Sequence, residues 1–158
     1  MAKSALKNPR VYSGVPLEKS TVRALDGQTW KQGQPGWYDS GYARPMATDD
    51  TTFEFFFAAN QDTAASSSDV VIETVPDGTR FVGYISSDDA DTVAAQAHVG
   101  GDYGIHVGLN VATVNVNETT TAVVHVDALL YQKEPYKNAS TDSPGQVIFH
   151  IKAAARDA

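Results

Sequence analysis

The sequence predicts an all-β fold: a small antiparallel barrel or sandwich with one short helix and an extended N-terminal arm. The first observation is the length of 158 residues, which is typical of one domain. The second is a series of about seven to nine short runs of β-branched and aromatic residues, separated by glycine, proline and aspartate turns. The third is the absence of the long amphipathic helices of repeated βαβ units, which argues against a doubly wound sheet.

Residues 1–24 are expected to form the arm. Pro9 and Pro16 disfavour a helix there, and residues 17–22 are interpreted either as a short first strand or as an anchor onto the body. Residues 1–23 carry five basic side chains and one acidic one, a net charge of +4. The remaining residues carry seven basic and 18 acidic side chains, a net charge of −11, which gives −7 in total. A basic leader on an acidic body is typical of an arm that reaches for a partner.

Residues 25–46 are rich in turn formers and aromatic residues, which suits short strands and loops. The strongest strand is Thr52–Ala58, where alternation predicts Phe53, Phe55 and Phe57 on one face and Phe56 on the other.

Further strands follow after a polar loop at 60–69. Residues 70–75 and 79–85 are expected to pair as a hairpin through Pro76-Asp77-Gly78. One short helix is expected at Asp88–Ala97, capped by Ser87 or Asp88 and ended by Gly100-Gly101. The remaining strands are expected at 103–107, 112–116, 120–130 and 147–152, with a loop at 135–145.

The expected organisation is therefore an arm at 1–24, a single β domain at 25–152 and a short polar tail at 153–158. Cysteine is absent, which excludes disulfides, thiolate nucleophiles and cysteine-ligated zinc. The N-terminus has no apolar run typical of a signal peptide, and no apolar run is long enough to span a bilayer. The acidic body argues against duplex nucleic acid as a partner.

No pattern of residues indicates catalysis, a cofactor or a metal. The histidines, His98, His106, His125 and His150, lack the spacing of local metal ligands and are interpreted as hydrogen-bonded strand or loop residues. Asp88-Asp89-Ala90-Asp91 lacks the later residues of a calcium loop. The segment 100–104 is not a phosphate loop, and no Gly-x-Ser-x-Gly elbow is present. We therefore expect no enzyme activity, no cofactor and no metal site.

The aromatic residues of the turn-rich region, Trp30, Trp37, Tyr38 and Tyr42, allow two interpretations, and so does Phe56. They are either part of the core, as aromatic residues usually are, or exposed anchors in a protein interface, where Trp and Tyr dominate binding energy.

Four stretches resemble the head decoration, or cement, proteins of tailed bacteriophages. They are Leu17–Val22, Gly41–Pro45, Val99–Ile105 and Asn117–Val124. The resemblance covers most of residues 17–151 and brings no catalytic residue with it. It implies a protein made in the host cytoplasm that ends on the outer surface of the virion. There it would bind the major capsid protein and neighbouring copies of itself, often as a homotrimer, and stabilise the shell without contacting membrane or nucleic acid.

Under this interpretation, residues from the arm and the aromatic region are expected to contact the capsid or a neighbouring copy: Lys3, Lys7, Arg10, Tyr12, Leu17, Lys19, Arg23, Trp30, Trp37, Tyr38, Tyr42 and Phe56. Two alternatives remain. One is a carbohydrate-binding or receptor-type β module of a virion or tail structural protein, with Trp30, Trp37 and Tyr38 stacking on sugars. The other is an enzyme that uses a pair of acids with no recognisable sequence signature.

Overall fold

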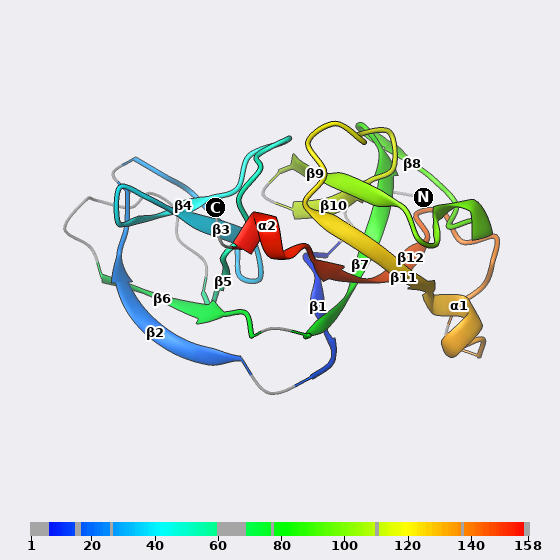
Figure 1. Cartoon of the computed structure of the whole chain (residues 1–158), viewed down its shortest axis with the longest axis horizontal. Coiled ribbons are helices and arrows are strands. Elements are labelled where there is room, and N and C mark those ends of the chain that lie inside the picture. Colours follow the sequence, from blue (N-terminus) through cyan, green and yellow to red (C-terminus); the bar gives the residue numbers. More distant parts are fainter. Residues whose placement is uncertain are drawn as a thin grey trace.

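The protein consists almost entirely of β-strands, arranged as a rolled sheet beside a closed barrel (Figure 1). This computed structural model describes residues 7–14, 17–25, 27–59, 69–76, 78–109, 111–136 and 138–156. The predicted all-β class, a small barrel or sandwich, is confirmed, and one pair of barrel strands runs parallel where antiparallel pairing was expected.

The barrel has five strands in the order β7-β10-β9-β11-β12, and it closes because β12 also pairs with β7. All pairs are antiparallel except β7 with β10, which run parallel. Two short strands, β1 and β8, pair with β7 outside this ring. The strands are β1 (Arg10–Ser13), β7 (Arg80–Ser87), β8 (Ala90–Asp91), β9 (Asp102–Gly108), β10 (Val111–Asn115), β11 (Val124–Leu129) and β12 (Gln146–Ile151).

The second sheet is antiparallel, in the order β2-β6-β5-β3-β4. Its two outer strands approach each other through a bridge between Ala24 and Ala43, and the Leu25 N–H donates to the Ala43 carbonyl at 2.9 Å. The sheet is therefore rolled around a small core of its own, which contains Trp30, Phe55, Phe57 and Ile72. The strands are β2 (Glu18–Arg23), β3 (Pro35–Asp39), β4 (Tyr42–Pro45), β5 (Phe55–Phe57) and β6 (Asp69–Thr74).

Strand β5 lies between the two hydrophobic cores and contributes side chains to both. Phe55 and Phe57 point into the rolled sheet, where Phe57 stacks on Trp30 at 4.1 Å between ring centroids. Phe56 points into the barrel core and lies 5.0 Å from the ring of Phe81. Phe53 was predicted to share a face with Phe55, but it precedes the strand and packs with Phe56 instead. Alternation on β5 thus buries aromatic rings on both faces.

The predicted helix at Asp88–Ala97 is wrong. Asp88 has a φ of +53°, and its N–H donates to the Asn115 side chain, so it forms a turn and not a helix cap. Strand β8 and a 3₁₀ turn, Gln96–His98, occupy this stretch. The two α-helices among the described residues are α1 (Leu130–Lys133) and α2 (Ala153–Arg156). The predicted polar tail is thus partly helical, and it buries Ala155.

The predicted hairpin between residues 70–75 and 79–85 is also wrong, because β6 belongs to the rolled sheet and β7 to the barrel. The segment between them crosses from one sheet to the other. Phe81 and Ile85 of β7 point into the barrel core, whereas Ile72 of β6 points into the other core. Each strand is paired where its apolar face is buried, and the turn sequence does not override that burial.

Most of the described part of the arm belongs to the body. Strand β1 pairs with β7, and β2 pairs with β6 over its full length. Pro9 is buried, and the Asn8 side chain accepts from the Ala112 N–H at 2.8 Å and donates to the Gln32 carbonyl at 3.2 Å. Both contacts hold the chain between the two sheets. Within the expected arm, residues 8–14 and 17–24 are therefore attached to the body, and residues 18–23 form a strand.

Candidate binding surface

Strand β2 has one open edge. It pairs with β6 on one side, and within the described residues no strand pairs with its other side, apart from the bridge at Ala24. The carbonyl of Val71 on β6 accepts from the Ala58 N–H at 3.0 Å, so the backbone of Val71 faces β5. Thr21 lies opposite Val71, and residues in such a pair direct their N–H and C=O groups away from each other.

Thr21 therefore directs its backbone groups toward the open edge, and Lys19 and Arg23 do the same because the pattern repeats every two residues. Leu25, two residues further on, donates to the Ala43 carbonyl on this side, as the pattern requires. An edge with unpaired backbone groups is a template for pairing with another extended chain.

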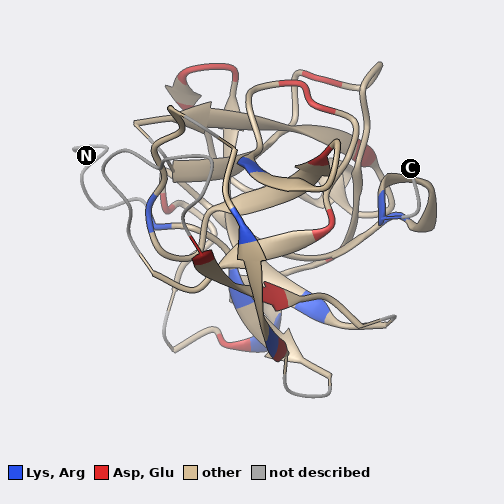
Figure 2. Cartoon of the chain, turned by 90° about the vertical axis from the view of Figure 1, so that its left-hand side faces the viewer, with Lys and Arg blue, Asp and Glu red and all other residues tan. Residues whose placement is uncertain are grey.

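The basic side chains of β2 lie opposite acids. Lys19 is in register with Glu73, and Arg23 is in register with Asp69. Figure 2 shows basic and acidic positions alternating on this part of the molecule. Two of the five basic residues of the N-terminal segment therefore lie opposite acidic positions of β6.

Strand β1 is exposed along its whole length and runs beside the barrel (Figure 1). Val11 and Tyr12 are both among the exposed large apolar residues, although they are neighbours in a strand. The Arg10 guanidinium donates to the Gln146 side chain at 3.3 Å. Leu17, between the two strands, is half-buried against the barrel core. Residues 7–14 and 17–23 thus present an extended surface that touches both sheets.

The predicted contact residues separate into three groups. Trp30 and Phe56 are 2% and 4% exposed, so the prediction of surface contacts is wrong for both: they are core residues. Leu17, Trp37 and Tyr38 are half-buried, and Lys3 lies outside the described residues. The exposed group is Lys7, Arg10, Tyr12, Lys19, Arg23 and Tyr42.

Trp37 and Tyr38 are held by polar contacts. The Trp37 Nε1 donates to Asp50 Oδ2 at 3.1 Å, and the Arg44 guanidinium lies 5.5 Å from the centre of the Trp37 ring. Burial, and then the nearby Glu54 carboxylate, raise the pKa of the Tyr38 hydroxyl. Near these residues, an open groove of about 400 Å³ separates β4 from the end of β9. Its lining is Gln28, Thr29, Gln34, Arg44, Pro45, Met46, Ala47, Thr48 and Val107.

A row of charged and titratable side chains that was not predicted from the sequence crosses the outside of the barrel. His125 Nδ1 lies 2.6 Å from Asp102 Oδ1, and Lys152 Nζ donates to Asp102 Oδ2 at 2.9 Å. His150 is in register with His125, and its Nδ1 lies 2.9 Å from Asp127 Oδ2.

The same Asp127 oxygen also accepts from the Arg80 Nε at 3.2 Å. The row therefore runs in the order Lys152, Asp102, His125, His150, Asp127 and Arg80, and the rings of the two histidines lie side by side, 5.2 Å apart between centroids. Hydrogen bonds from Lys152 and then His125 lower the pKa of Asp102. The sequence signal that could have indicated this row is the spacing of His125 and Asp127, because residues two positions apart on a strand share one face of the sheet.

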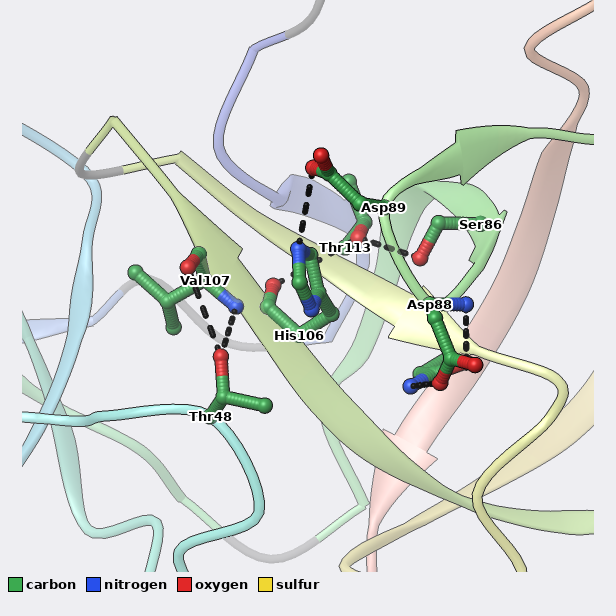
Figure 3. Close-up of polar contacts among 8 residues, drawn as sticks. Thr48, Ser86, Asp88, Asp89, His106, Val107 and Thr113 are labelled. Carbon is green, nitrogen blue, oxygen red and sulfur yellow. Dashed lines mark hydrogen bonds and ion pairs between the residues drawn. The ribbon is translucent and has the colours of Figure 1, made fainter.

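A second polar cluster lies near the end of the barrel where β7, β9 and β10 meet (Figure 3). Asp88 accepts from the side-chain amides of Asn115 at 3.1 Å and Asn117 at 2.7 Å, and these two hydrogen bonds lower its pKa. His106 Nε2 lies 3.5 Å from Asp89 Oδ1. Hydrogen bonds are thus formed by the side chains of His98, His125 and His150, as predicted, and His98 Nδ1 accepts from the Ala95 N–H at 3.1 Å.

Within the described ranges, no group of three or more His, Cys, Asp or Glu side chains is placed to hold a metal ion. No helix in the described part of the chain is long and apolar enough to cross a membrane. The chain matches no protein-family model, and no curated protein or solved structure is found to be similar to it.

Proposed function

We propose that this protein is a capsid decoration protein that acts by binding alone. It attaches to the outer surface of a phage head, contacts the major capsid protein and bridges neighbouring subunits. The proposal begins from the resemblance of residues 17–22, 41–45, 99–105 and 117–124 to such proteins. The single structural observation that carries it further is the open edge of β2.

The open edge supports binding by strand addition. Lys19, Thr21 and Arg23 offer backbone N–H and C=O groups to an extended segment of a capsid subunit, and such main-chain hydrogen bonds provide affinity. The two basic side chains lie on one face of β2, four residues apart. An extended capsid segment with acidic residues at the same spacing would place opposite charges across the new pair.

Several copies would reinforce each other. The resemblance implies trimers at three-fold or quasi-three-fold positions of the shell. Each copy then needs only a modest contact, because attachment at several points converts weak contacts into high avidity. The net charge of −7 keeps the free protein soluble before it docks.

The test is a proline on the open edge. Thr21→Pro removes the outward N–H and fills the space beside it, whereas no hydrogen bond to β6 is lost. We expect this variant to keep the fold and to lose binding to expanded phage heads in a sedimentation assay. Thr21→Val is the matched control, since it keeps the N–H group and should bind as the wild type does. Equal occupancy of the heads by all three proteins would refute strand addition at β2.

A carbohydrate-binding module is the second candidate, because the groove beside β4 is lined by amide, hydroxyl and guanidinium groups suited to sugar hydroxyls. Of the residues expected to stack on sugars, Trp30 is buried, and Arg44 lies over the ring of Trp37. A change in tryptophan fluorescence on glycan addition that Arg44→Ala abolishes would favour this candidate. An unchanged spectrum across a glycan panel would remove it.

A further inference from the structure

The hairpin between β9 and β10 contains a residue that its turn does not favour. Gly108 and Val111 face each other across a two-residue loop, and Leu109, the first loop residue, has a φ of +52°. Such loops prefer asparagine, aspartate or glycine, since an L-residue with a large side chain is strained at positive φ.

The hairpin between β3 and β4 provides an internal comparison. Asp39 and Tyr42 face each other there, and the loop residues are Ser40, with a φ of +52°, and Gly41. The same backbone geometry is therefore built from small or polar residues elsewhere in the chain. Among the described residues, the other non-glycine positions with positive φ are Asp49 and Asp88. Leu109 is the exception, because its side chain alone among these four has no polar group that could offset the steric cost of positive φ by a local hydrogen bond.

The apolar side chain of Leu109 is also exposed to water, which is unfavourable. Its side chain is 88% exposed, the highest value among the exposed large apolar residues. A leucine at this position gains no stability from burial. Asparagine would be less strained at positive φ, and its polar side chain would be better solvated. Strained backbone conformations of this kind cluster at functional sites.

Side-chain hydrogen bonds from other parts of the chain hold both strands of the hairpin that carries Leu109. The Thr48 hydroxyl accepts from the Val107 N–H at 2.9 Å and donates to the Val107 carbonyl at 3.3 Å (Figure 3). On the other strand, the Asn8 side chain accepts from the Ala112 N–H. These contacts fix the pair Val107 and Ala112, the second residue pair from the loop, so Leu109 is presented on a rigid support. A rigid support lowers the entropy lost on binding.

We propose that Leu109 is an anchor residue that inserts into an apolar pocket of the capsid protein. This inference rests on the proposed function and adds a second contact to the open edge of β2. A second copy of this chain is a poorer partner, since the described groove nearest the hairpin is lined by more polar than apolar side chains. A pocket lined by aliphatic or aromatic side chains would bury Leu109 on docking.

The experiment compares three variants in the same assay of binding to expanded heads. Leu109→Asn keeps the backbone shape with less strain, so its melting temperature should equal or exceed that of the wild type, while its affinity should fall by about tenfold or more. Leu109→Met keeps an apolar side chain and should retain binding. Tyr136→Asn is the control, since Tyr136 is 84% exposed and lies on another loop, and it should bind normally.

The outcomes separate the two proposals. Wild-type binding with an unchanged Leu109→Asn affinity would overturn the anchor and leave the decoration function standing. An equal loss in the Leu109→Asn and Tyr136→Asn variants would also overturn it, because any exposed apolar residue would then serve. Wild-type protein that does not bind heads would overturn the proposed function and, with it, the capsid as the partner of Leu109.

Discussion

At the residue scale, Phe56 shows how the two cores depend on each other. Its ring lies between Phe53, at 5.2 Å, and Phe81, at 5.0 Å, whereas its neighbours on β5 point into the other core. We expect Phe56→Ala to destabilise the protein by about 3–5 kcal/mol, because truncation leaves a cavity where the sheets meet. Urea unfolding measures this change.

Tyr42→Ala is a suitable control for that measurement, since Tyr42 is exposed on β4 and its loss should change the free energy of unfolding by less than about 0.5 kcal/mol. If Phe56→Ala were no more destabilising than this control, the ring would not connect the cores.

A second residue-scale prediction concerns acid stability. Hydrogen bonds from Lys152 and His125 keep the pKa of Asp102 below its ordinary value. A carboxyl group with a lowered pKa in the folded state stabilises the fold fully above its unfolded pKa, about 3.9, and this contribution is lost as the pH falls through the folded value. We expect Asp102→Asn to lose less stability than the wild type when unfolding is measured between about pH 6 and pH 3. Parallel stability curves would contradict the role of Asp102.

At this scale, the roles of classes of residue are predictable from the sequence, whereas the surroundings of particular side chains are not. The histidines were expected to form hydrogen bonds, and the side chains of His98, His125 and His150 do so. Burial of Trp30 and Phe56 was left open, because the same aromatic residues serve in cores and in interfaces. Their surroundings come from strands distant in the sequence, and no local pattern specifies those.

At the element scale, the orientation of β2 gives a sharp comparison between adjacent residues. Ser20 lies opposite Ile72 and directs its N–H toward β6, whereas Thr21 directs its N–H outward. We expect Ser20→Pro to destabilise the protein by about 1–3 kcal/mol, since it leaves a partner group on β6 without its hydrogen bond. Thr21→Pro should be clearly less destabilising in thermal unfolding. The reverse order would show that the open edge is on the wrong set of residues.

The C-terminal helix provides another element-scale prediction. The Ala155 carbonyl accepts from the Phe53 N–H at 3.0 Å, and the Ala155 side chain is buried beside the barrel core. Deleting residues 153–158 should therefore lower the free energy of unfolding by about 1–3 kcal/mol. A polar tail without contacts would give no change, which is the result that would contradict this account.

The positions of the strands were easier to predict than the pairing between them. Period-two alternation and turn residues placed most strands to within a few residues, since both signals are local. Pairing depends on which core each apolar face enters, and this is why the turn at residues 76–78 suggested a hairpin that does not exist. The helix predicted after Ser87 failed for a related reason: Asn115, which is remote in sequence, holds Asp88 in a turn.

At the scale of the whole molecule, the N-terminal segment combines anchoring and exposure. Asn8 and Pro9 are held between the sheets, while β1 and β2 remain at the surface. The segment was predicted to be a separate arm because its charge differs from that of the body. Folding places two of its basic residues, Lys19 and Arg23, opposite acids of β6, so composition alone did not reveal the attachment.

The central claim is that the protein docks on a phage head through the open edge of β2. Cryo-electron microscopy of heads decorated with the protein tests it most directly. We expect regular external density that bridges capsid subunits, with an extended capsid segment beside Lys19, Thr21 and Arg23. Density with this edge facing solvent, or heads without external density for the protein, would contradict the claim.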